Sequence, residues 1–139
     1  MYQRILLAVD GSKHSERATE QAVAIASLTE GSLIEVVLVA DFSKAKNEVL
    51  HSQGKEELEV ARRKKLINIE KIIQEKNVSY EVNILHGEPG PTIVSHANDQ
   101  QFDLLVIGSR GLNTLQEMVL GSVSHKVVKR ADCPVLVVK

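Results

Sequence analysis

The sequence has few of the residues that mark several specialised classes of protein. Among 139 residues there is one cysteine, Cys133, no tryptophan, two tyrosines and two phenylalanines. A single cysteine excludes an intramolecular disulfide, so the simplest interpretation is an interior thiol in a reducing compartment. The shortage of aromatic rings leaves little material for a surface on which nucleic-acid bases could stack.

Excess charge and long apolar runs are also missing. The formal net charge is −1, whereas a nucleic-acid-binding domain usually needs a basic face, so we expect no nucleic-acid partner. The N-terminal apolar run stops at Asp10 and is too short for a signal sequence or a membrane span. The apolar content of 43% and the charged content of 25% are ordinary for a globular protein. We therefore expect a single cytoplasmic domain over residues 1–139, without membrane association.

Apolar runs alternate with amphipathic segments along the chain. Ser12 is suited to cap the first helix, Gly31 to stop it in a left-handed conformation, and Pro91 to the first turn of the third helix. Residues 42–53 are polar and irregular, which indicates a loop. The predicted strands are residues 4–9, 33–40, 80–85, 103–108 and 134–138, and the predicted helices follow Ser12, span 53–76, open near residues 87–92, and span 122–131.

This alternation predicts an α/β fold with a five-stranded, parallel, doubly wound sheet and helices on both faces. We expect the strand order 3-2-1-4-5. The third strand alternates apolar and polar residues, which is typical of a strand with one wetter face and places it at an edge. The order also makes the gap between the first and fourth strands the point where ligands bind in such sheets.

Two loops meet at that point, and their composition favours an anion. Asp10, Gly11 and Ser12 follow the first strand, while Gly108, Ser109, Arg110 and Gly111 follow the fourth. After nine intervening residues, Gly121, Ser122, Val123 and Ser124 begin a helix, whose N–H groups and dipole favour a phosphate. Glycines let the backbone approach an anion closely, the two serines of the helix add hydroxyl donors, and Arg110 adds a positive charge.

Several familiar sites are excluded by spacing. The one Gly-Lys pair, Gly54-Lys55, is followed by Glu56 and not by serine or threonine, so there is no Walker A loop. The glycines of interest follow the fourth strand, whereas the dinucleotide fingerprint follows the first. The histidines lack the spacing of a protein-built metal site, and no G-x-S-x-G turn presents a nucleophilic serine. Cys133 is expected to be inert in the core.

The pattern G-x2-G-x9-G-S, on this order of elements, resembles the universal stress protein family. The segments "ILLAVDGSKHSERA", "GSRGLNTLQEMVLGSVSHKVV" and "ADCPVLVVK" carry the resemblance, which extends over essentially the whole chain. It implies a Rossmann-like fold of the adenine nucleotide alpha hydrolase type. Because the chain keeps every glycine and serine of the motif, it resembles the ATP-binding branch of the family.

The resemblance also implies roles for individual residues. The phosphates would be held by the motif glycines and serine, and Asp10 would face the ribose or a divalent ion, Mg²⁺ or Mn²⁺, on the phosphates. The backbone near Val39 and Ala40 would frame the adenine. The full set of expected nucleotide-binding residues is Ala8, Val9, Asp10, Gly11, Ser12, Val39, Ala40, Gly108, Ser109, Arg110, Gly111, Gly121, Ser122, Val123 and Ser124.

Each of these residues also has a purely structural interpretation. The glycines are common turn residues, Gly121 and Ser122 could only cap a helix, and Asp10 could order its own turn. Arg110 could pair with a surface carboxylate. The apolar insert at residues 112–120 favours a packed helical turn or a partner contact over a mobile lid. The run "EELEVARRKK" at residues 56–65 is interpreted as a solvated charged face of the second helix.

Three functions follow from this pattern. The first is a regulatory protein of the stress response that binds ATP, and the second is a slow ATPase or a phosphoryl- or nucleotidyl-transferring enzyme. The third is an interaction module in which the nucleotide is incidental. The last strand, Pro134 to Val138, forms an apolar edge, and with the resemblance it predicts a homodimer. The sequence does not identify the natural adenine nucleotide, the stress or the downstream partner.

Overall fold

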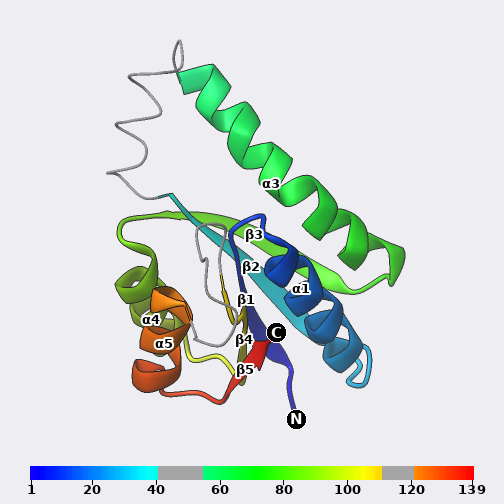
Figure 1. Ribbon diagram of the computed structural model, residues 1–139. Helices are drawn as coiled ribbons and strands as arrows, with labels where there is room; N and C mark the ends of the chain where they lie inside the picture. The colour runs from blue at the N-terminus through cyan, green and yellow to red at the C-terminus, as the bar shows by residue number, and fades with distance from the viewer. Residues whose placement is uncertain (41–54, 111–120) are drawn as a thin grey trace.

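The computed structural model describes residues 1–40, 55–110 and 121–139, and its strands and helices alternate as the sequence predicts (Figure 1). The predicted loop at 42–53 and the apolar insert at 112–120 lie outside these residues. The elements are β1 (Arg4–Val9), α1 (Lys13–Ala26), β2 (Leu33–Ala40), α3 (Lys55–Glu75), β3 (Ser79–His86), α4 (Pro89–Gln100), β4 (Leu104–Gly108), α5 (Ser122–Arg130) and β5 (Val135–Val138).

The five strands form one sheet in the order β3-β2-β1-β4-β5, with every neighbouring pair parallel. The predicted fold class and strand order are therefore confirmed. β3 lies at one edge, as its alternating pattern indicates, and its residues are at most half-buried along their length. β5 forms the opposite edge, and all four of its residues are half-buried.

In the part of the chain that the structure describes, two helices cover each face of the sheet, and β1 supplies side chains to both cores. Ile5, Leu7 and Val9 pack with α1 and α3, whereas Leu6 and Ala8 pack with α4 and α5. Successive strand side chains point to opposite faces, so a strand covered on both sides must be apolar at every position. This requirement explains why residues 5–9 form an uninterrupted buried run.

The helix boundaries differ slightly from the sequence-based expectations. α1 ends at Ala26, and Gly31 adopts its left-handed φ of 83° in the turn before β2 rather than directly stopping the helix. α3 spans Lys55–Glu75, close to the predicted 53–76. α4 begins at Pro89, so Pro91 does lie in its first turn.

α3 is buried through its C-terminal half. Leu66, Ile69 and Ile73 are buried in the core, whereas Val60 and Ile67 are more than half exposed. In Figure 1, α3 lies alongside α1, and its N-terminal end extends beyond the edge of the sheet where the strands end. The helix therefore reaches from the core to the rim at which the predicted site lies.

Candidate functional site at the carboxyl ends of the strands

The two predicted loops lie side by side because the strands that carry them are neighbours. β1 pairs with β4 up to Ala8 and Ile107, so the loop after Val9 and the loop after Gly108 leave the same edge of the sheet. Both loops emerge at the switch point of the strand order, where α/β sheets bind ligands. The structure thus brings residues 10–12 and 108–110 together, as predicted.

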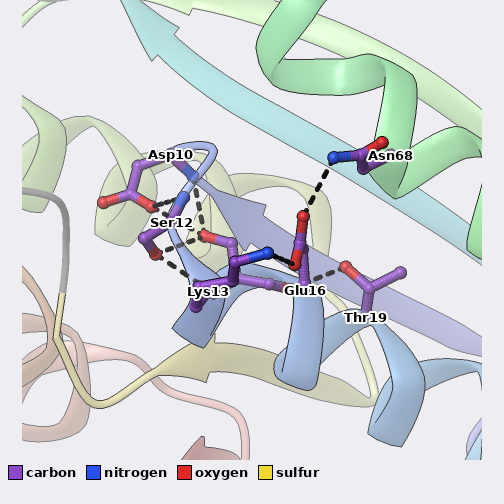
Figure 2. Close-up of polar contacts among 7 residues, drawn as sticks. Asp10, Ser12, Lys13, Glu16, Thr19 and Asn68 are labelled. Atoms are coloured by element: carbon purple, nitrogen blue, oxygen red, sulfur yellow. Dashed lines mark hydrogen bonds and ion pairs between the residues drawn. The ribbon is translucent and has the colours of Figure 1, made fainter.

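The loop after β1 is ordered by a compact hydrogen-bond network (Figure 2). Asp10 Oδ1 accepts the Ser12 amide at 2.9 Å and the Ser15 hydroxyl at 2.8 Å, and Ser15 Oγ in turn accepts the Asp10 amide at 2.9 Å. Ser12 Oγ caps α1 by accepting the Ser15 amide at 3.1 Å, which confirms its predicted capping role. Both serines are buried, so their hydroxyls order the turn and hold the Asp10 carboxylate in place.

Two glycines of the site have steric reasons to be glycine. Gly11 has a φ of 85°, a conformation that other residues rarely adopt. Gly108 lies directly against the first turn of α1, where an added Cβ would come within 2.7 Å of His14 Cβ and 3.0 Å of its carbonyl carbon. Gly108 therefore allows α1 to pack closely on the end of β4, a structural role that exists without any ligand.

The loop after β4 is tied to α5 through one carbonyl. The oxygen of Ser109 accepts both the Gly121 amide at 2.8 Å and the Ser124 hydroxyl at 2.9 Å. The Ser124 hydroxyl also lies 3.0 Å from the Gly121 carbonyl, and its residue is 2% exposed. Ser124 thus connects α5 to β4, and its hydroxyl proton is directed to protein carbonyls, not to a ligand.

The hydroxyl of Ser109 itself has no hydrogen-bond partner within the described parts of the chain, although its residue is only 5% exposed. Buried hydroxyls normally have a partner, because an unpaired one costs roughly 1–3 kcal/mol. The Ser109 hydroxyl is therefore a buried donor that the described residues leave unsatisfied.

The N-terminal end of α5 lies beside the backbone of Ser109, whose carbonyl accepts the Gly121 amide. Gly121 is the N-cap, its conformation is extended, and no side chain within the described residues caps the helix. The first intrahelical bond joins the His125 amide to the Gly121 carbonyl at 2.9 Å, which leaves the preceding amides at the helix end. Ser122 is exposed at this end and Val123 is half-buried, so the Ser122 side chain is accessible to a ligand.

Positive charge surrounds the first turn of α1. Burial is the main cause that lowers the pKa of His14, and the neighbouring guanidinium groups of Arg17 and Arg110 lower it further, while Asp10 acts in the opposite direction. The net lowering of the pKa favours the neutral form of His14. Arg110 lies close enough to these groups to act on them, so a cation is present at the switch point.

The end of β2 forms a step next to the site. The pairing of β1 with β2 ends at Val9 and Leu38, so Val39 and Ala40 extend past β1. Both residues are half-buried, and the Ala40 carbonyl accepts the Gly87 amide at 3.0 Å. Ala8 and Val9 are buried in the two cores, so they can contribute only backbone groups to the site.

Most of the predicted site residues thus lie at one rim of the sheet, while Gly111 lies outside the described residues. Three residues that sequence reasoning missed also lie there: Ser15, His14 and Lys65. Ser15 lies three residues after the N-cap Ser12, the position from which the Glu or Gln of a capping box reaches back to the turn, so its place in the sequence was the one local signal that could have identified it. His14 and Lys65 have no local signal, because their position depends on how α1 and α3 pack.

The described residues give little support for a reactive cysteine or a protein-built metal site. Cys133 is half-buried at the margin of the core beneath α4 and α5, and burial raises the pKa of its thiol, which disfavours the reactive thiolate. Within residues 1–40, 55–110 and 121–139, no three His, Cys, Asp or Glu side chains are grouped as metal ligands would be. None of the helices in these ranges has the length and apolar character needed to cross a membrane.

Known proteins are similar to this chain over its full length. Universal stress protein YxiE of Bacillus subtilis is 36% identical in an alignment of 157 residues that covers all of both chains. Among solved structures, hypothetical protein MJ0577 has a TM-score of 0.84 and 32% identity, covering 100% of this chain and 96% of its own.

Two further solved structures contain an adenine nucleotide. A universal stress protein from Archaeoglobus fulgidus, in complex with dAMP, has a TM-score of 0.74, 25% identity and coverage of 99% and 98% of the two chains. A universal stress protein family member from Arabidopsis thaliana, with AMP bound, has a TM-score of 0.66, 25% identity and coverage of 99% and 91%. The model of the universal stress protein family matches residues 1–139, and this chain belongs to that family.

Proposed function

We propose that this protein is a cytoplasmic regulator of the stress response that binds an adenine nucleotide, ATP in the first instance, at the rim formed by β1, β2 and β4. Related proteins with the same fold have been solved with dAMP and with AMP, which supports an adenine nucleotide as the ligand. The G-x2-G-x9-G-S pattern of this chain supports a ligand with several phosphates.

The observation that carries this proposal is the Ser109 hydroxyl, unpaired among the described residues, in a residue whose carbonyl is hydrogen-bonded to the uncapped end of α5. A phosphate at this position would accept hydrogen bonds from the Ser109 hydroxyl and from the helix amides, and it would lie at the positive end of the helix dipole. The exposed Ser122 hydroxyl and the Arg110 guanidinium would add further donors. Hydrogen bonds to charged groups contribute roughly 1.5–3 kcal/mol each, so a few of them are sufficient for specific binding.

The step at the end of β2 suits the adenine. Val39 and Ala40 extend past β1, so they offer backbone groups at the rim without a strand partner on that side. With the phosphates at α5, the ribose would lie over the end of β1, close to Asp10. The adenine, the ribose and the phosphates would then lie at the ends of β2, β1 and β4, three neighbouring strands. Other sheets of this type also bind nucleotides at the switch point.

A divalent ion would be held chiefly by the nucleotide. Asp10 Oδ1 already accepts two hydrogen bonds, and the described residues contain no group of three or more His, Cys, Asp or Glu side chains that could hold a metal ion. Mg²⁺ commonly keeps several waters and binds through one or two carboxylates together with phosphates. The residues therefore fit an ion that arrives on the phosphates, with Asp10 facing it, and they do not fit a protein-built metal centre.

The test is to identify the nucleotide that the protein carries and to measure its affinity. The protein would be purified without added nucleotide, denatured, and its supernatant analysed by mass spectrometry and ultraviolet absorbance. Near-stoichiometric ATP is the expected result, and co-purified ADP or AMP would favour the enzyme alternative. A protein that carries no nucleotide and shows no binding by calorimetry at millimolar ATP and magnesium would refute the proposal.

We also propose that two copies associate through β5. Among the described strands, none pairs with the outer edge of β5, whose residues are half-buried, and no charged residue interrupts Val135–Val138. Edges of this kind tend to pair with a second strand.

A further inference from the structure

α3 lies directly on the loop that carries Asp10. A Cβ built on Gly11 would be 2.9 Å from Lys65 Cγ, 3.1 Å from Lys65 Cβ and 3.5 Å from Lys65 Cα. The stem of Lys65 therefore occupies the space that any other residue at position 11 would fill. Together with its φ of 85°, this contact gives Gly11 a second reason to be glycine.

The contact between α3 and α1 continues one helical turn further along. Asn68 Nδ2 donates to Glu16 Oε1 at 3.1 Å, and Figure 2 shows the Asn68 side chain extending from α3 toward α1. Beneath this contact, Leu66 and Ile69 are buried in the core. The position of Lys65 is thus set by packing on both sides of it in the sequence, and it is not an arbitrary surface position.

The four basic residues at positions 62–65 of α3 differ in their exposure to solvent. Arg63 and Lys64 are exposed, whereas Arg62 and Lys65 are half-buried. The prediction that this run is a solvated charged face therefore holds for only part of it. Lys65 lies on the side of α3 that faces the β1–α1 loop, and its neighbour Lys64 faces solvent.

The ammonium group of Lys65 forms no ion pair with a described neighbour. Lys13 pairs with Glu16 and Lys126 with Glu88, but no hydrogen bond or ion pair of the Lys65 ammonium occurs among the residues that the structure describes. The ammonium is three bonds beyond Cγ, the atom that lies on Gly11. It is therefore within a Debye length, about 10 Å, of a ligand seated over Asp10.

From this geometry we propose that Lys65 is a specificity-determining residue that makes the site favour nucleotides with more phosphate groups. The inference rests on the proposed nucleotide site, and it adds a third cationic element, from α3, to Arg110 and the end of α5. The attraction between a fixed cation and a ligand grows with the ligand's negative charge, so Lys65 stabilises bound ATP more than bound AMP. A residue that only packed on Gly11 would affect both ligands equally.

The experiment compares Lys65→Met with Lys64→Met, a matched control that removes the same charge from the next residue on the exposed side. The affinities of AMP, ADP and ATP would be measured by calorimetry at about 0.1 M salt, where the Debye length is about 10 Å, and without divalent ions, so that the ligand charge rises along the series. We expect Lys65→Met to weaken ATP binding about fivefold and AMP binding less than about twofold, the size of effect that one partly screened charge produces. Lys64→Met should change neither affinity, and Lys65→Arg should retain the preference for ATP.

Equal losses for AMP and ATP in Lys65→Met, or the same loss in Lys64→Met, would overturn the inference while leaving the nucleotide site intact. A wild-type protein that binds AMP and ATP equally well would also overturn it. If the wild-type protein bound none of the three nucleotides, the proposed function itself would fail, and the inference with it.

Discussion

At the scale of single residues, two serines two positions apart in α5 have different roles. Ser122 is exposed at the helix end, whereas Ser124 is 2% exposed and donates its hydroxyl to the carbonyls of Ser109 and Gly121. Both were expected from sequence to offer donors to a phosphate. The structure assigns the Ser124 hydroxyl to the protein, because the carbonyls that it reaches are close to it.

Substituting each serine by alanine should separate the two roles. We expect Ser122→Ala to weaken ATP binding severalfold with little change in stability, since only a ligand contact is lost. Ser124→Ala should lower the free energy of unfolding by about 1 kcal/mol, the usual worth of a neutral hydrogen bond. Calorimetric titration and urea denaturation of both variants would check this, and the opposite pattern would contradict the assignment.

At the scale of elements, α4 is joined to the sheet by a buried polar cluster. Glu35 of β2 lies 8% exposed, and its carboxylate contacts His96 Nε2 of α4 at 2.5 Å and accepts Asn83 Nδ2 of β3 at 3.1 Å. A polar residue in the middle of a strand that is otherwise covered on both faces needs such partners, because an unpaired buried carboxylate is costly. The cluster therefore specifies how α4 sits on β2 and β3.

Removing the Glu35 carboxylate should destabilise the protein because His96 and Asn83 would lose a buried partner. We expect Glu35→Ala to lower the free energy of unfolding by about 2 kcal/mol. Glu88→Ala is a suitable control: its ion pair with Lys126 is exposed, and its loss should cost less than about 0.5 kcal/mol. Urea denaturation of both variants is the measurement, and equal losses would show that the buried cluster has no special role.

At the scale of the whole molecule, the two edges of the sheet differ. β3 carries polar and charged side chains between its apolar ones, whereas Val135–Val138 of β5 is entirely apolar. Charged residues on an edge strand discourage pairing with another sheet. The asymmetry predicts that self-association uses β5 and not β3.

A lysine in the middle of β5 should therefore prevent dimer formation. We expect the wild-type protein to be a dimer by light scattering at tens of micromolar, and Leu136→Lys to shift it to a monomer. The corresponding change at the other edge, Ile84→Lys, should leave the dimer intact. A wild-type monomer, or dissociation by the β3 variant alone, would refute pairing through β5.

The sequence by itself determined the order of strands and helices, the two edges and the loops at the switch point, because each depends on local pattern and on general rules of chain connection. Apolar periodicity identified β1 and β4 as buried, and the connection lengths required parallel strands. The tertiary structure alone decided which side chains have spare hydrogen-bonding capacity: the Ser109 hydroxyl is unpaired among the described residues, and the Ser124 hydroxyl is used. It alone also brought Lys65 to Gly11 across 54 positions, because the contact depends on how α3 packs on α1, which no local pattern encodes.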